Sequence, residues 1–224
     1  MTEPRLLSIQ VSLPRRIDAA EAPDPAGNGW TTGFFKTPVS GHVWLGSANL
    51  AGDGQGDTKN HGGPDKAVLA YAAAHYAAWR AELGQPELPH GAFAENFTIA
   101  DLDEESVCIG DTYAIGEALL QVSQPRQPCW KIGARWRSPD LTARVEASGR
   151  TGWYLRVLRE GNVTAGDAVM LLERPHADWS VARATRTMRR RDDLAGAAAL
   201  AALPALAVSW RDGLARRVRE GRVA

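Results

Sequence analysis

Short strand-like segments broken by turn-forming residues dominate the first 175 residues of this chain. Runs rich in β-branched, aromatic and other apolar residues alternate with Gly, Pro and Asp, which favour turns. Gly110-Asp111 and Gly166-Asp167 are matching turns, each placed before such a run. The predicted strands are 6–13, 43–45, 67–71, 112–115, 118–122, 153–158 and 168–172. Many short strands with few helices between them predict a closed β-barrel or a sandwich.

Two helices are expected to interrupt the strands. In 73–83, Tyr76, Trp79 and Leu83 fall on one face at helical spacing. In 139–147, Ser138 is placed to cap the first turn. The fold class predicted for 1–175 is therefore mainly β with a few helices.

The pattern changes after Pro175. Ser180 can cap a helix that runs to about 191, and Asp192 can cap a second one that runs to about 203. An apolar stripe then predicts a third helix, formed by Leu206, Trp210, Leu214 and Val218. We expect two domains, 1–175 and a small three-helix appendage at 176–224.

The charge and composition exclude several classes of protein. The 224 residues carry a formal net charge of zero, so overall charge does not indicate nucleic-acid binding. No signal peptide or membrane helix is expected, and two cysteines fit a reducing cytoplasm. Residues 176–224 hold ten Arg and five acids, a net charge of +5. An acidic partner protein could recognise this charge, or the Arg residues could simply occupy the solvent-facing sides of small helices.

The segment around Cys129 carries the strongest chemical signal. The thiol lies in Gln124-Pro-Arg-Gln-Pro-Cys129-Trp-Lys131, next to Arg126 and Lys131 and at the start of a predicted short helix. Cations and a helix N-terminus lower a thiol pKa, and thiolate is both a nucleophile and a soft metal ligand. Cys108, between Val107 and Ile109, is predicted to be structural.

A long polar loop, 51–66, ends in three chemically capable side chains: His61, Asp65 and Lys66. Its glycines and acids resemble a calcium or phosphate loop, but the spacing fits neither an EF-hand nor a Walker motif. What remains is a flexible loop whose backbone can approach a ligand closely. His61, Asp65 and Lys66 are candidates for positioning a substrate or delivering protons.

Two further segments are candidate binding elements. Glu95-Asn96 stands at the entry to a strand, where a carboxylate and an amide could orient a ligand, or an Asx-turn could simply start the strand. Ser148-Gly-Arg150-Thr-Gly152 is a compact turn that suits an oxyanion, or an ordinary helix-to-strand connection.

Taken together, five motifs resemble the MOSC-domain family, and their order and spacing resemble its YiiM-like branch. The segment from Trp179 resembles the three-helix domain that often follows in that branch. The motifs are KTPVSG (36–41), HGGPDKAV (61–68), GAFAEN (91–96), SQPRQPC (123–129) and SGRTGWY (148–154). The family usually has Gly where this chain has Ala94.

The resemblance implies a β-barrel MOSC core that binds a molybdenum–pyranopterin cofactor, with Cys129 as the metal ligand. It implies a cofactor-binding role for the polar residues of the shared motifs and their neighbour Lys131, with cations serving the cofactor's phosphate. The expected cofactor-binding residues are Lys36, Glu95, Asn96, Arg126, Gln127, Lys131, Ser148 and Arg150.

The resemblance further implies an oxidoreductase that reduces N-hydroxylated compounds, such as hydroxylamino base analogues, in a detoxifying role. Electrons would come from an external donor protein, because two cysteines cannot bind a Cys₄ iron–sulfur cluster. Two alternatives remain open. One is a cofactor or sulfur carrier without turnover; the other is a metal-free thiol enzyme with Cys129 as nucleophile and His61 as base.

Overall fold

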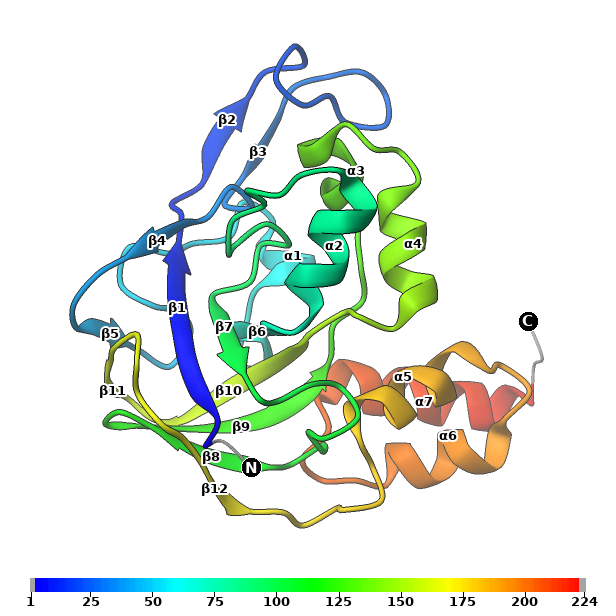
Figure 1. The fold of residues 1–224 in the computed structure, drawn as a ribbon. Helices are drawn as coiled ribbons and strands as arrows, with labels where there is room; N and C mark the ends of the chain where they lie inside the picture. Colours follow the sequence, from blue (N-terminus) through cyan, green and yellow to red (C-terminus); the bar gives the residue numbers. More distant parts are fainter. Residues whose placement is uncertain (1–2, 222–224) are drawn as a thin grey trace.

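A computed structural model describes residues 3–221 of the chain, shown as a ribbon in Figure 1. An eight-stranded sheet forms its centre, in the order β12-β8-β9-β10-β6-β7-β1-β4. All neighbours are antiparallel except β6 and β7. The strands are β1 (Arg5–Val11), β4 (Thr37–Val39), β6 (Val68–Ala72), β7 (Phe97–Ala100), β8 (Thr112–Ile115), β9 (Ala118–Pro125), β10 (Trp153–Arg159) and β12 (Val169–Glu173).

Two small two-stranded sheets and several helices complete the fold. The small sheets pair β2 (Arg15–Ile17) with β3 (Trp30–Thr32), and β5 (Val43–Leu45) with β11 (Gly161–Val163). The helices are α1 (Thr58–His61), the 3₁₀ helix η1 (Pro64–Lys66), α2 (His75–Leu83), α3 (Lys131–Trp136), α4 (Leu141–Ser148), α5 (Val181–Arg189), α6 (Leu194–Ala201) and α7 (Val208–Glu220).

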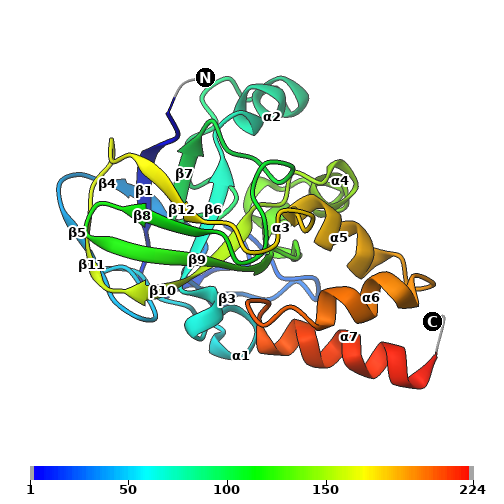
Figure 2. The ribbon, with the colours of Figure 1, turned by 90° about the horizontal axis from the view of Figure 1, so that it is seen from below.

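The sheet is not closed into a barrel, so this part of the predicted fold class is wrong. The segment that leads into the edge strand β12 meets β1, the strand beside the other edge strand β4, through a bridge between Arg5 and Ala168. The Leu6 backbone N–H donates to the Asp167 carbonyl at 2.9 Å, and the Val169 N–H, at the start of β12, donates to the Pro4 carbonyl at 2.8 Å. Among residues 3–221, this pairing does not continue along the rest of β12. The result is a curved, open, mixed α/β arrangement (Figures 1 and 2).

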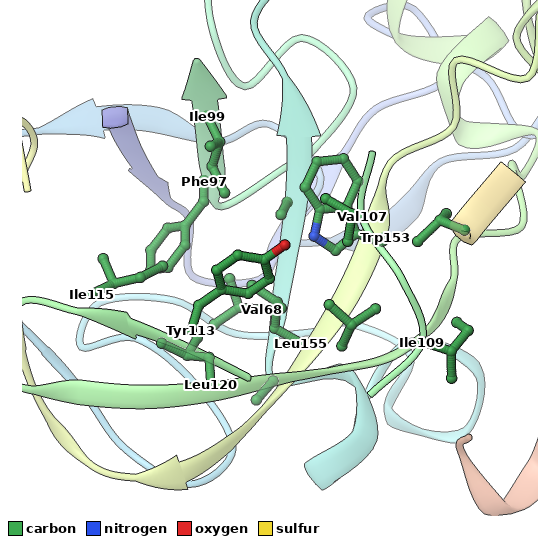
Figure 3. Close-up of a cluster of buried hydrophobic side chains, with 14 of the residues drawn as sticks. Val68, Phe97, Ile99, Val107, Ile109, Tyr113, Ile115, Leu120, Trp153 and Leu155 are labelled. Atoms are coloured by element: carbon green, nitrogen blue, oxygen red, sulfur yellow. The ribbon is translucent and has the colours of Figure 1, made fainter. Parts of the chain in front are cut away.

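The core explains why β6 could be recognised from sequence. All five residues of β6, Val68–Ala72, are buried, as expected for a central strand with one parallel neighbour. Side chains from several strands meet there in an apolar cluster around Phe97, Tyr113 and Trp153 (Figure 3). The same continuous cluster includes Trp179 and Trp210 from the C-terminal part of the chain.

The C-terminal helices form as the capping signals predict, with one shift. Ser180 caps α5 by accepting from the Arg183 N–H at 3.1 Å. The second cap is Asp193, one residue after the predicted Asp192, and it accepts from the Gly196 N–H at 2.8 Å. Ser138 does not cap α4, because its hydroxyl donates to Asp140 instead. Within residues 3–221, no helix is long and apolar enough to cross a bilayer.

Candidate functional site

A pocket lies where the 51–66 loop, the β3–β4 connection and the segment after β9 meet. Most of the residues that line it come from these three segments. Its lining residues are Thr32, Gly33, Phe34, Lys36, Gly54, Gln55, Gly56, Asp57, His61, Lys66, Leu69, Ala94, Asn96, Arg126, Gln127, Cys129, Lys131 and Tyr154. Eight of the twelve predicted site residues are therefore brought together here, from positions 36 to 131 of the chain.

Arg126 is the residue that most clearly indicates a ligand. It follows β9 directly, and its backbone N–H donates to the Gly152 carbonyl at 3.0 Å, which fixes it beside β10. The residue is 3% exposed, yet its Nη1 has no hydrogen-bond partner among residues 3–221. A buried cation without a partner is costly. An anion in the pocket would satisfy it.

Lys131 and Lys36 differ in how their charges are balanced. Lys131, the first residue of α3, is buried and holds its ammonium 5.6 Å from the centre of the Trp30 ring. Lys36 is also buried, but its ammonium forms an ion pair with Asp53. Burial lowers the pKa of Lys36, and Asp53 opposes that shift. Lys131 is therefore the better candidate for contact with an anionic ligand.

Cys129 lies directly before the N-cap of α3, Trp130. Its carbonyl accepts from the Ile132 N–H at 3.2 Å and from the Thr142 hydroxyl at 3.1 Å. These bonds fix the backbone while the residue lines the pocket, partly exposed. Cys108, in contrast, is buried, and burial raises its thiol pKa, in agreement with the predicted structural role.

His61 ends α1 and lines the same pocket. Burial and then the positive charges of Lys131, Arg126 and Lys66 lower its pKa to about 4, while Asp57 acts in the opposite direction. The imidazole is therefore neutral at pH 7. A base this weak is poorly suited to activate a thiol, which disfavours the metal-free thiol enzyme.

We expect inorganic phosphate to raise the pKa of His61 above its value of about 4, because burial lowers this pKa first and the neighbouring cations second, and a bound anion would offset the cations. A ¹H–¹⁵N NMR titration of the imidazole, assigned with His61→Gln, measures this change. Chloride at equal ionic strength is the control. An unchanged pKa at saturating phosphate would show that the anion binds elsewhere.

Lys66 and Asp65 are neighbours, but the structure separates their roles. Lys66 lines the pocket, and its ammonium donates to the Asn60 carbonyl at 2.6 Å. Burial lowers the pKa of Lys66. Asp65 does not line the pocket, and its carboxylate forms an ion pair with Arg156 at 2.8 Å. Asp65 is thus placed to hold the structure together rather than to contact a ligand.

Asn96 lines the pocket, but its amide is already engaged. Its oxygen accepts from the Leu69 N–H at 3.1 Å, and its NH₂ donates to the Gln10 carbonyl at 3.1 Å and to Asp53 at 2.9 Å. Asn96 therefore joins three segments of the pocket wall. Gln127, by contrast, is exposed at the pocket, and its side chain forms no hydrogen bond with residues 3–221.

Glu95 is placed away from the pocket, contrary to the predicted cofactor contact. It is fully buried, and its carboxylate accepts from the Tyr76 hydroxyl, from the Gly91 N–H at 2.6 Å and from the Phe93 N–H at 3.1 Å. Thr98 adds a further bond at 3.1 Å. The carboxylate thus shapes the 91–98 turn that lies behind the pocket wall.

Ser148 and Arg150 are also absent from the pocket lining. The Ser148 hydroxyl donates to the Val145 carbonyl within α4 at 3.0 Å. The Arg150 guanidinium pairs with Glu82 at 2.8 Å and lies 3.7 Å from the centre of the Trp79 ring. This turn joins α4 to β10, as its alternative interpretation predicted, and its Arg is already paired.

Two residues at this site were not predicted as site residues from the sequence: Asp57, which lines the pocket, and Asp53, which is not a lining residue but contacts two residues that are. Asp53 joins Lys36, Asn96 and the Ser12 N–H, to which it is bonded at 2.8 Å. Asp57 caps α1 by accepting from the Asn60 N–H at 3.1 Å. Both lie in the 51–66 loop, and for Asp57 its place directly before a short helix was the available signal.

Ala94 also lines the pocket, and its φ is 65°. This is the left-handed region, which Ala enters at a cost of about 1 kcal/mol relative to Gly. The position at which the resemblance led us to expect Gly thus adopts a backbone conformation that favours Gly.

The donor set limits how a metal could be held. Across the described part of the chain, 3–221, no group of three or more His, Cys, Asp or Glu side chains could bind a metal ion together. One cysteine can supply a single ligand. Arg126, whose buried Nη1 has no partner among the described residues, and Lys131 line the same pocket as the Cys129 thiol. These residues fit a metal that is bound within an anionic cofactor, because such a cofactor supplies the other metal ligands and a phosphate for the cations.

The fold and the pocket agree with matches to known families. Residues 57–170 match the MOSC domain, and residues 179–221 match the YiiM-like 3-alpha helix domain. The chain therefore belongs to the MOSC-domain family, in its YiiM-like branch, as the motifs indicated. This family includes molybdenum-cofactor-binding proteins.

Three relatives illustrate the likeness. YflK of Bacillus subtilis is 44% identical over 80% of this chain and 81% of its own length. A protein of Gibberella moniliformis named Reductase is 40% identical over a region that covers 72% of this chain and 29% of that protein. The crystal structure of YiiM from Geobacillus stearothermophilus is 35% identical and has a TM-score of 0.80, covering 96% of this chain and 99% of that one.

Proposed function

We propose that the pocket binds a molybdenum–pyranopterin cofactor, with the Cys129 thiolate as a ligand to the metal. The observation that carries this proposal is the buried Arg126 guanidinium, whose Nη1 lacks a partner, in a pocket that also holds the thiol. A thiolate suits a soft, redox-active metal, and a phosphate group would complete the hydrogen bonding of Arg126.

Each pocket cation has a distinct part in this proposal. Arg126 and Lys131 hold the cofactor's phosphate, while Lys36, neutralised by Asp53, shapes the wall. Lys66, whose pKa burial lowers, can give up a proton more readily than an exposed lysine. His61 is neutral, so it offers one N–H donor and one acceptor for orienting a substrate.

The proposed reaction is the reduction of N-hydroxylated compounds. The N–O bond breaks, two electrons and two protons enter, and an amine and water leave. The bound cofactor supplies the two-electron chemistry, and the protein supplies orientation and protons. Support comes from the family and from the fungal relative named Reductase. An external donor protein supplies the electrons, docking on the basic 176–224 segment.

The test is turnover of an N-hydroxylated base analogue by holoprotein, with a reduced viologen dye as electron donor. We expect Cys129→Ser to lose at least about 100-fold in rate, because it removes the metal's only protein ligand in this proposal. Cys108→Ser is the matched control and should keep turnover. Absence of turnover by molybdenum-loaded wild type would favour a carrier without catalysis.

A further inference from the structure

The 3₁₀ helix η1 presents its two charged residues to different parts of the molecule. Lys66 lines the pocket, whereas the Asp65 carboxylate points to β10 and to the start of α7. This short segment therefore connects the pocket to the C-terminal helices. Figure 2 shows the cyan segment that carries α1, three residues before η1, alongside the beginning of α7.

The Asp65 carboxylate has a partner on each oxygen. Oδ1 accepts from Arg156 Nη2 at 2.8 Å and from its Nε at 2.9 Å. Oδ2 accepts from the Val208 backbone N–H at 3.2 Å. Val208 is the first residue of α7, and its N-cap, Ala207, has no side chain to cap the helix. Asp65 therefore supplies, from another part of the chain, the acceptor that α7 lacks.

A second connection runs through the backbone of the same residues. The Ser123 hydroxyl donates to the Asp65 carbonyl at 2.6 Å, and the Ser123 carbonyl accepts from the Ala207 N–H at 2.8 Å. Ser123, in β9, therefore links η1 on one side to the start of α7 on the other. The position of the Lys66 backbone is thus fixed from the side that faces the C-terminal helices.

We propose that Asp65 is a positioning residue through which the C-terminal helices hold Lys66 in the pocket. This inference rests on the proposed function in so far as the pocket binds an anion. Asp65 itself contacts no ligand. The helical unit contributes to ligand binding by supplying the Val208 N–H and the Ala207 N–H that hold η1 in place.

A proline at position 208 removes the relevant N–H with little other change. Val208 is the first helical residue, where Pro is well tolerated, and Ala207 has φ −53° and ψ 139°, which suits a residue before Pro. Val208→Ala keeps the N–H and removes the exposed side chain, so it is the matched control. Ser123→Ala removes the bond to the Asp65 carbonyl and serves as an independent second variant.

Two measurements are made on each variant: calorimetric binding of inorganic phosphate, and the Nζ resonance of Lys66 in ¹⁵N-lysine-labelled protein. The chain has four lysines, so Lys66→Arg identifies the signal. We expect Val208→Pro and Ser123→Ala to shift the Lys66 resonance and weaken phosphate binding about threefold or more. Val208→Ala should match wild type in both.

A role confined to stability would lower the melting temperature without moving the Lys66 resonance, and that result would overturn the proposal. Equal resonances and affinities in Val208→Pro and Val208→Ala would overturn it as well. If wild type fails to bind phosphate, the anion pocket fails instead, and the comparison of Lys66 resonances still decides the role of Asp65.

Discussion

Arg126→Met should weaken phosphate binding by about 10- to 100-fold and make the ligand-free protein more stable. The guanidinium is 3% exposed and its Nη1 lacks a partner, so the unliganded protein bears an uncompensated buried cation. Methionine fills much of the same space without charge. We expect a rise of about 1 kcal/mol or more in the free energy of unfolding. Calorimetry and urea unfolding measure the two effects.

Arg211→Met, an exposed change on α7, is the control and should alter neither quantity much. Weaker phosphate binding together with a higher free energy of unfolding distinguishes a ligand-binding arginine from a structural one. Loss of several kcal/mol with unchanged phosphate affinity would show that Arg126 supports the fold, and the anion site would have to be placed elsewhere.

Glu95→Gln should destabilise the protein by about 2 to 4 kcal/mol while leaving phosphate affinity within about twofold of wild type. The fully buried carboxylate accepts from Tyr76, Gly91, Phe93 and Thr98. An amide group loses the charge and turns an NH₂ toward an N–H donor. Urea unfolding with phosphate calorimetry tests both parts.

The exposed Glu87→Gln is the matched control for Glu95→Gln and should be close to neutral. A stable Glu95→Gln protein with greatly weakened phosphate binding would contradict the structural role. It would restore Glu95 as a binding residue, as the motif first suggested.

Local patterns predicted much of the fold. Val43–Leu45 and Thr112–Ile115 are strands as predicted, and the Ser180 cap and the apolar stripe at Trp210 gave two of the C-terminal helices. The prediction of a closed barrel was wrong, because closure depends on pairing between segments that are far apart in sequence. The meeting of β1 with β12 is limited to the bridge between Arg5 and Ala168 and the backbone hydrogen bonds beside it.

The site was predictable where chemistry and position coincide. Arg126, Cys129 and Lys131 lie within six consecutive residues, so their proximity in the pocket follows from the sequence. Asp65 and Lys66 are adjacent and were both predicted as site residues, yet the 3₁₀ helix η1 directs only Lys66 to the pocket and directs Asp65 to Arg156. Residue type shows which side chains can bind a ligand, but their direction depends on tertiary contacts.

The hydrogen bonds and ion pairs that polar side chains form within the folded chain could not be predicted from the sequence either. Glu95 and Arg150 are chemically suited to a cofactor, but in the folded chain each has its own partners. Asp53 was considered only as the start of a rejected EF-hand, yet it contacts Lys36, 17 residues before it, and Asn96, 43 residues after it. Such pairings arise from which segments the fold brings together, and a single sequence does not reveal them.

If the pocket binds a molybdenum cofactor through Cys129, as we propose, the metal content of the protein depends on this thiol. The most direct measurement is the molybdenum content of wild type and Cys129→Ser, purified in parallel from a host that makes the pterin cofactor. We expect close to one molybdenum per wild-type chain and little in the variant. Equal molybdenum in both proteins would contradict the proposal, since the thiol would then not be a ligand.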